Sequence, residues 1–271
     1  QLFCVGDDWQ SIYGFRGSNV SYIVEFENHF TNARTIKLNL NYRSTQNIVG
    51  ASNEVIKNNK FKVEKDVQAS KKSEHKIVVY SGNSEEENIQ FCLEKVRELL
   101  EDGISNDEIL FLYRRSKMYS PYFYRFKNEG IRVQGKTIHA SKGLEAKVVF
   151  IIGLTEGSGG FPDIWLEDRI FQVIKKANHD LLMEEERRLF YVAITRAKDK
   201  LFLITEKGNE STFLKEIPEA FTVRTTLPIK AVVDKVIICD SCFSQLEKLW
   251  VVCPYCGQKV KKNEHENNSD R

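Results

Sequence analysis

Four cysteines near the end of the chain have the spacing of a metal site. They form two C-x2-C pairs, at Cys239, Cys242, Cys253 and Cys256. Four thiolates arranged in this way suit tetrahedral Zn²⁺, and the alternative is four buried free thiols. In a chain of this length the pattern is typical of metal binding and not of disulfides, so we expect a reducing, cytoplasmic compartment. The predicted zinc ribbon is either a structural staple or a contact surface for DNA or protein through Phe243 and Trp250.

An arginine on an apolar helical stripe is the second chemical feature. The periodicity predicts a helix over 184–198, on which Leu189, Val192, Ala193 and Arg196 share one face. A buried guanidinium is costly unless an anion meets it. That anion is either a core carboxylate or a phosphate, and phosphate oxygens fit the planar guanidinium better. We therefore expect Arg196 to point inward to a phosphate.

Alternating strands and helices must position these groups. Apolar, β-rich runs predict strands at 76–81, 109–113, 147–154 and 200–205, and helical patterns cover 85–100, 120–128 and 184–198. Ser84 and Glu87 predict a capping box at the start of the first helix, and Asp102-Gly103 predicts its end. This alternation predicts an α/β fold with a parallel sheet and helices on both faces.

Composition sets limits on function. The 271 residues are 41% hydrophobic and carry a net charge of +2, so affinity for DNA would come from a local groove and not from a global field. No apolar run approaches the length of a membrane span. The first residues show no signal peptide, lack an initiator Met and read as the middle of a strand, so we expect a fragment of a longer chain.

Four blocks of sequence stand out along the chain. They are VGDDWQSIYGFRG at 5–17, LNYRS at 40–44, TIHASKGLE at 137–145 and EEERRLFYVAITRA at 184–197. In this order they resemble motifs III, IV, V and VI of the UvrD/Rep/PcrA family of superfamily-1 DNA helicases, and the helicase IV type is the most similar branch. The resemblance covers roughly residues 1–205.

The resemblance implies a P-loop NTPase fold, in which this chain supplies the second RecA-like motor domain. It implies that the terminal phosphate of ATP is contacted by Gln10, Arg43 and Arg196. It implies that the nucleotide is also held by Tyr42 on the adenine, by Glu145 on the ribose and by the adjoining Gly143. It implies that single-stranded DNA is contacted by Tyr13, Phe15, Arg16, His139 and Ser141. Read without the resemblance, the aromatic pair with its arginine indicates core packing, and the histidine indicates a satisfied core residue.

The resemblance, the cysteine spacing and the polar C-terminal residues together set the expected domains. We expect a remnant of the first motor domain at 1–38, the second motor domain at 39–227, the zinc ribbon at 228–262 and a disordered tail at 263–271. Within the 271 residues there is no G-x4-G-K-[ST] loop and no D-E-x-x-D strand, so ATP and Mg²⁺ need a further N-terminal half and the chain alone is expected to be inactive. The interval between Ser44 and Thr137 is filled by predicted βαβ elements, which leaves no room for the insertion subdomain of long-insert relatives.

These expectations define one function and two alternatives. The chain is predicted to be the C-terminal motor portion of an ATP-dependent single-stranded-DNA translocase or helicase, of the kind used in DNA repair. Its expected partners are single-stranded DNA and the N-terminal motor half of the same protein, with no membrane and a monomeric state. The first alternative is a non-catalytic module that binds nucleic acid or protein and keeps the motor fold without turnover. The second is part of a nuclease–helicase fusion.

Overall fold

The computed structural model describes residues 2–157, 159–164 and 179–226, together with the short pieces 237–238, 245–246 and 256–258. Contacts divide the chain into two units, 1–226 and 227–271, and each is described by itself. In the second unit, β9 (Ile237–Ile238) pairs antiparallel with β10 (Gln245–Leu246). Cys256 is exposed, and the other three cysteines of the predicted zinc site lie outside the described residues. Over the described residues alone, no group of three or more potential metal ligands comes together.

A six-stranded sheet forms the centre of the first unit, with the strand order β5-β4-β6-β7-β3-β8. Every neighbouring pair in it is parallel. The strands in that order are β5 (Gln134–Thr137), β4 (Ile109–Tyr113), β6 (Ala146–Ile151), β7 (Ala197–Glu206), β3 (Ile77–Gly82) and β8 (Thr222–Thr225). All five residues of β4 are buried, because a parallel sheet covered on both faces exposes neither side of its inner strands.

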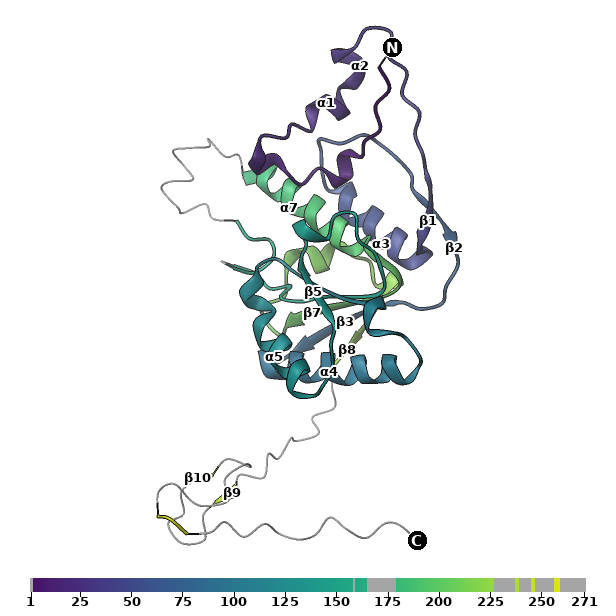
Figure 1. The fold of residues 1–271 in the computed structure, drawn as a ribbon. Coiled ribbons are helices and arrows are strands. Elements are labelled where there is room, and N and C mark those ends of the chain that lie inside the picture. The colour runs from purple at the N-terminus through teal and green to yellow at the C-terminus, as the bar shows by residue number, and fades with distance from the viewer. Residues whose placement is uncertain are drawn as a thin grey trace. The chain divides into compact units, whose positions relative to one another are not determined.

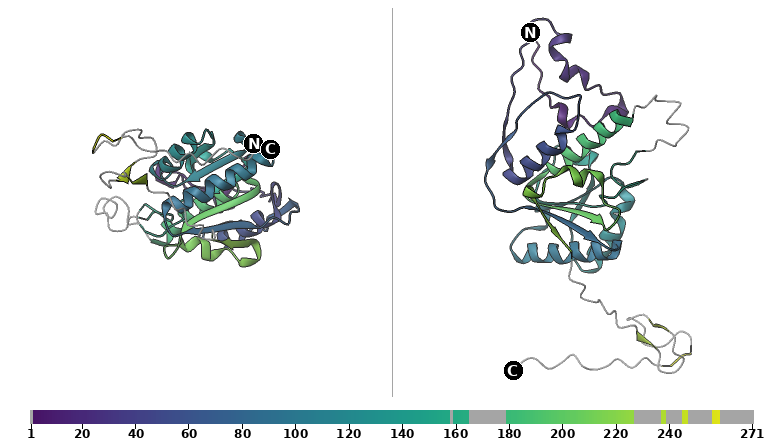
Figure 2. Two further views of the ribbon diagram at one scale, coloured as in Figure 1. Left: turned by 90° about the horizontal axis from the view of Figure 1, so that it is seen from below. Right: turned by 180° about the vertical axis from the view of Figure 1, so that it is seen from behind.

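Helices cover both faces of this sheet (Figure 1). One face carries α3 (Gln46–Lys57) and α7 (His179–Ile194), and the other carries α4 (Glu85–Glu101) and α5 (Ser120–Asn128), as the view from behind in Figure 2 also shows. The core joins β4, β6 and β7 to the apolar face of α7, where Leu189, Phe190 and Val192 are fully buried. The predicted α/β fold with a parallel sheet is therefore confirmed.

The segment before this sheet is built from short elements. They are η1 (Asp8–Gln10), η2 (Gly14–Arg16), α1 (Ser21–Val24), α2 (Phe26–His29) and β1 (Leu40–Thr45), and β1 pairs in parallel with β2 (Gln68–Lys71). The expectation of a strand in the first residues is wrong for residues 2–6. No described segment pairs with them, and Leu2, Phe3 and Val5 are exposed.

Short 3-10 turns link the larger elements of the first unit. They are η3 (Asn106–Glu108), η4 (Ser116–Met118), η5 (His139–Ser141), η6 (Thr212–Glu216) and η7 (Glu219–Phe221). Both η4 and η5 follow strands of the sheet at their carboxyl ends, so they lie at the edge where functional loops of parallel sheets gather.

Two local predictions need correction. The helix predicted over 184–198 is α7, which ends at Ile194, so Arg196 lies in the turn into β7 and not on the helix. The chain must leave the helix there because Ala197 already pairs with Ala146 of β6. The capping box at α4 forms only in part: the Ser84 hydroxyl accepts from the Glu87 amide, but the Glu87 carboxylate accepts from the amide of Asn83.

Other bounds are close to those predicted. β4 and α5 begin and end where the sequence indicated, and α4 ends at Asp102-Gly103, where Gly103 has a φ of 82°. The predicted strand 147–154 is shorter, because β6 ends at Ile151. Across the described residues, no helix is both long and apolar enough to cross a membrane.

Candidate functional site

The Arg196 guanidinium lies in the core of the site and is held by uncharged acceptors. The residue is 1% exposed, and Nη2 donates to Oε1 of Gln10 at 3.3 Å. Its other bonds go to the carbonyls of Leu144 (3.2 Å) and Val192 (2.9 Å) and to the Thr195 hydroxyl (3.2 Å). Burial, and next the charge of Arg43, lower the pKa of Arg196 from 12.5 to about 10. The side chain stays protonated at neutral pH, and among the described residues no carboxylate pairs with it.

Gln10 is brought to Arg196 by the tight turn η1. Asp7 caps this turn by accepting from the Trp9 amide, and its other oxygen accepts from Nε2 of Gln10 at 2.6 Å. That bond orients the amide so that Oε1 of Gln10 faces Arg196. The indole of Trp9 donates to the carbonyl of Val63 at 3.1 Å, which ties the turn to the loop after α3.

Glu145 bridges two cations beside Arg196. Its Oε2 accepts from Nε of Arg43 at 2.5 Å, and its Oε1 pairs with Nζ of Lys198 at 2.7 Å. The hydrogen bonds from Lys198 and then Arg43 lower the pKa of Glu145 from 4.5 to about 2. Two cations, Arg43 and Lys198, therefore pair with one carboxylate, whose charge also acts on Arg196.

Three hydrogen bonds, one of them buried, hold the strand that carries Arg43. The side chain of Asn41 accepts from the amides of Arg43 and Ser44, both at 2.9 Å. The Ser44 hydroxyl donates to the carbonyl of Ala197 at 2.6 Å, next to Arg196 in the chain. This hydrogen bond joins the strand that carries Arg43 to the segment that carries Arg196, so the two arginines are fixed relative to each other.

Tyr42 and Gly143 are neighbours of this cluster in the sequence, and neither takes part in the hydrogen bonds given above. Tyr42 is 72% exposed, so most of the residue is open to solvent. Gly143 has a φ of 91°, a conformation that only glycine adopts without strain, and a Cβ there would meet no atom. Its identity is explained by the turn that carries Glu145 into β6.

A second group of side chains forms an aromatic surface, which consists of Tyr13, Phe15, Arg16, His139 and Lys142. Tyr13 and Phe15 are 6.1 Å apart between ring centroids, and the His139 ring lies 5.3 Å from Phe15 in an edge-on contact. The Arg16 guanidinium lies 5.5 Å from the Phe15 centroid, and Lys142 Nζ lies 5.2 Å from the Tyr13 centroid. Phe15 is 57% exposed, so this surface offers open ring faces flanked by positive charge.

His139 and Ser141 play different parts on this surface. Burial, and next the charges of Arg114 and Arg16, lower the pKa of His139 from 6.5 to about 4, so its imidazole is neutral at pH 7. Ser141 is fully buried, and its hydroxyl donates to the carbonyl of Ile138 at 2.7 Å. In this conformation the Ser141 hydroxyl closes its own turn and faces the protein.

Lys142 links the two groups, and the sequence reasoning did not single it out. Its Nζ donates to the carbonyl of Gln10 at 2.9 Å while it lies over the Tyr13 ring. Lys198 was missed in the same way. The sequence signal for Lys142 is that it directly follows the predicted site residue Ser141, and the signal for Lys198 is that it directly follows the last of the four blocks.

Three further arginines near α7 are held by carboxylates. Arg187 forms a two-pronged pair with Glu216, Arg188 pairs with Glu184 at 3.2 Å, and Arg114 pairs with Glu186 at 2.8 Å. Burial raises the pKa of Glu186 and lowers that of Arg188. Arg196 differs from all three because its acceptors are neutral.

A parallel sheet with helices on both faces, beside which cations, a glutamine and an aromatic surface lie, defines the class of the molecule: it is an α/β domain of the parallel-sheet type. The sequence matches the UvrD-like helicase C-terminal domain family over 36–135 and 125–208, and residues 1–31 match the UvrD/REP helicase N-terminal domain family. The chain belongs to the UvrD-like helicase family.

Curated relatives agree with this assignment. The chain is 32% identical to DNA helicase IV of Escherichia coli K12 over 79% of this chain and 31% of that protein. It is 34% identical to a probable DNA helicase of Mycoplasma pneumoniae over 75% of this chain and 38% of that protein. It is 37% identical to the ATP-dependent DNA helicase PcrA of Staphylococcus epidermidis over 42% of this chain and 16% of that protein. The chain spans less than two fifths of the length of each of these relatives.

One solved structure covers the same region. It is the C-terminal domain of a possible DNA helicase from Lactobacillus plantarum WCFS1, with a TM-score of 0.46 and 18% identity over 68% of this chain and 98% of that one.

Proposed function

We propose that this chain is the C-terminal motor portion of an ATP-dependent translocase or helicase that acts on single-stranded DNA. The observation that carries the proposal is the contact between Gln10 and Arg196, two residues from opposite ends of the described fold that meet beside Arg43. Guanidinium groups held in this way neutralise the negative charge that develops on a transferred phosphoryl group. The names of the relatives, which are DNA helicases, support the same function.

In this proposal each group has its own part in phosphoryl transfer. Arg196 and Arg43 supply positive charge to the terminal phosphate, and Gln10 reports its presence because its amide already bonds to Arg196. Glu145 holds Arg43 in position until nucleotide arrives and then takes the ribose, while Tyr42 stacks on the adenine. The phosphate-binding loop and the Mg²⁺ ligands come from the N-terminal motor half, so the chain alone does not hydrolyse ATP.

The aromatic surface is the proposed path for single-stranded DNA. Bases stack on exposed aromatic rings with little regard to sequence, and Arg16 adds positive charge at the edge of the Phe15 ring. The carbonyl of Gln10 accepts from Lys142, which itself lies over Tyr13. A movement of DNA on the Tyr13 ring is thus coupled through Lys142 to Gln10, the residue that contacts Arg196.

Binding of a fluorescent single-stranded oligonucleotide to the chain tests this path. Phe15→Ala removes a stacking face, so we expect the Kd to rise about tenfold, in the range for one lost base stack of roughly 1–3 kcal/mol. Phe123→Ala is the matched control, because Phe123 is 47% exposed on α5 and lies outside the aromatic surface. Equal effects of the two substitutions would contradict the proposed path. Tight DNA binding by a longer protein that never hydrolyses ATP would favour a non-catalytic binding module.

The paired cysteines support a second, separate part of the proposal, which rests on their spacing. Cys239, Cys242, Cys253 and Cys256 hold one Zn²⁺ as a structural staple of the second unit, in a reducing compartment. Elemental analysis of chain purified without chelator should give one zinc per molecule, and Cys239→Ser should lower that content. Zinc-free protein with a folded second unit would contradict the assignment.

A further inference from the structure

Lys65 lies in the loop between α3 and β2, outside the four sequence blocks, and it contacts the turn η1. Its Nζ donates to Oδ1 of Asp7 at 2.7 Å and also lies 2.7 Å from Oδ1 of Asp8. The same ammonium group lies 4.7 Å from the centroid of the Trp9 ring. One lysine therefore contacts the three consecutive residues that lead to Gln10.

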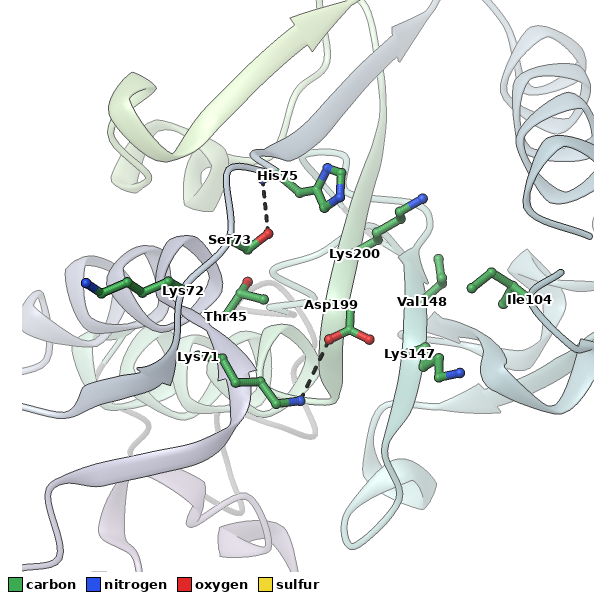
Figure 3. A pocket seen from close by; sticks show the side chains of 10 residues that line it. All are labelled: Thr45, Lys71, Lys72, Ser73, His75, Ile104, Lys147, Val148, Asp199 and Lys200. Atoms are coloured by element: carbon green, nitrogen blue, oxygen red, sulfur yellow. Dashed lines mark hydrogen bonds and ion pairs between the residues drawn. The ribbon is translucent and has the colours of Figure 1, made fainter. Parts of the chain in front are cut away.

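This contact is largely buried. The side chain of Lys65 is 13% exposed and that of Asp8 is 2% exposed, and within the described residues no other cation pairs with the two carboxylates. Oδ2 of Asp8 accepts from the Val63 amide at 2.7 Å, whereas its Oδ1 has no hydrogen-bond partner in the structure and faces the ammonium charge. A surface pair looks different: beside a pocket of about 410 Å³, Lys71 reaches Asp199 at 3.7 Å and is 42% exposed (Figure 3). Removing the cation from the buried contact is therefore much more disruptive than removing it from the surface pair.

The Asp7 carboxylate connects this lysine to Gln10. Its Oδ1 accepts from Lys65 and from the Trp9 amide, and its Oδ2 accepts from Nε2 of Gln10 at 2.6 Å. Because one oxygen is tied in this way, the other faces the Gln10 amide in a fixed direction, and Oε1 of Gln10 then lies 3.3 Å from Arg196. Within the described part of the chain Lys65 makes no hydrogen bond to Gln10, so its effect passes through Asp7.

The loop that carries Lys65 is itself anchored to α7. The Glu184 carboxylate of that helix accepts from the Lys60 amide at 2.8 Å. The same helix leads directly into the turn of Arg196. Both partners of the contact between Gln10 and Arg196 are therefore held by α7, one along the chain and the other through the loop and its lysine.

We propose that Lys65 is a positioning residue for nucleotide hydrolysis, because it fixes the Asp7 carboxylate that orients Gln10 toward Arg196. This inference rests on the proposed function of Gln10 at the terminal phosphate. Without the lysine charge two neighbouring carboxylates repel each other, so the Asp7 side chain turns toward solvent and releases Nε2 of Gln10. The amide then rotates freely and its contact with Arg196 weakens. Because that contact serves the phosphate as it is transferred, the loss falls on turnover and much less on nucleotide affinity.

Side-chain amide signals of the ¹⁵N-labelled 271-residue chain test the positioning without any activity. Lys65→Met keeps the apolar stem and removes the charge, so the NH₂ signal of Gln10, which Gln10→Ala assigns by its loss, should move toward that of an exposed glutamine. Asp8→Asn is the matched control, because it changes the other acidic partner of the lysine and leaves the Asp7 bond to Gln10 intact. Lys71→Met removes the same charge from the surface pair, and neither control should move the signal. An unmoved signal in Lys65→Met, or equal movement in Lys65→Met and Asp8→Asn, would overturn the proposal.

ATP hydrolysis by a longer protein, which carries this chain together with a phosphate-binding loop, tests the consequence. With rates corrected for the folded fraction, Lys65→Met should lower kcat about tenfold and leave the KM for ATP nearly unchanged, the order expected for one lost hydrogen bond to a charged group. Lys65→Arg keeps the cation and should restore most of the turnover. If Lys65→Met unfolds the turn, its combination with Asp8→Asn removes one of the two negative charges as well and takes its place.

A double variant separates positioning from a general structural role. If Lys65 acts through Gln10, Lys65→Met should cause no further loss of kcat when it is added to Gln10→Ala, whereas independent effects would multiply. Multiplied losses, or a kcat for Lys65→Met equal to that of the parent while Gln10→Ala is impaired, would overturn this inference alone. Turnover of Gln10→Ala equal to that of the parent would contradict the proposed function, and the amide signals would then decide the positioning by themselves.

Discussion

The environment of Arg196 predicts that its removal abolishes turnover at a modest cost in stability. The perturbation is Arg196→Ala, compared with Arg188→Ala as a matched buried arginine. Arg196 bonds only to neutral acceptors, whereas Arg188 pairs with the buried carboxylate of Glu184. The two variants therefore remove the same side chain from sites that differ in the charge of the partner.

The magnitude for Arg196 follows from two opposing contributions. The pKa is lowered from 12.5 to about 10, so the unfolded chain binds this proton more tightly than the folded chain does. Below about pH 10 the buried charge therefore destabilises the fold, by about 3 kcal/mol, and Arg196→Ala removes that penalty. The same change removes the four hydrogen bonds of the guanidinium, each contributing roughly 1 kcal/mol, and some packing. We expect a net loss of about 1–3 kcal/mol.

The control should behave in the opposite way. Arg188→Ala leaves Glu184 buried without its cation, and breaking a buried pair in this manner costs about 3–5 kcal/mol. Because Arg188 lies away from the proposed phosphate position, turnover per folded molecule should stay near normal. Arg196→Ala should lower turnover by roughly 10³-fold or more, with nucleotide binding much less affected.

Two assays check these values. Denaturant unfolding of the chain gives the change in the free energy of unfolding for both variants. ATP hydrolysis, corrected for the folded fraction, is measured in a longer protein that carries this chain together with a phosphate-binding loop. A large loss of stability with near-normal turnover for Arg196→Ala would refute its role at the phosphate and make it a structural arginine.

Three further predictions follow from the charged groups of the site. The folded-state pKa of His139 is about 4, against an ordinary value of 6.5, so the fold loses stability as pH falls from 6.5 to 4. His139→Gln should remove this loss of stability. Melting temperatures of variant and parent with the same pH dependence would contradict the prediction. Glu145 has a folded-state pKa of about 2, so its stabilising pairs are complete above pH 4.5 and weaken as pH falls toward 2. Glu145→Gln should reduce the pH dependence of stability in that range. Acid titration followed by circular dichroism measures this dependence. The same variant should release Arg43 and raise the KM for ATP more than it changes kcat in the longer protein, and an unchanged KM would argue against a nucleotide contact.

Much of the fold was predictable because its strands are buried on both faces. The run Ile109–Tyr113 is apolar at every position except its last, as is typical of an inner strand of a parallel sheet covered on both faces. The bounds of α5 were predictable for a related reason, since Pro121 stands in its first turn and the periodic pattern stops at Asn128.

The partners inside the site were not predictable in the same way. Arg196 was expected to meet an anion, but its acceptors are neutral, and two of the four, the Leu144 carbonyl and the Gln10 amide oxygen, come from far away in the sequence. No periodicity encodes such contacts, because they depend on how β6, β7 and η1 meet in space. The pairing of Lys198 with Glu145 was missed for the same reason.

The central claim is that this chain forms one wall of an ATP-driven motor and needs a phosphate-binding loop from the other. The most direct test is ATP hydrolysis with and without single-stranded DNA, by the 271-residue chain and by a longer protein that also contains such a loop. The account predicts no turnover by the chain and DNA-stimulated turnover by the longer protein, lost on Arg196→Ala. DNA-stimulated hydrolysis by the chain alone, or a longer protein that never hydrolyses ATP, would contradict it.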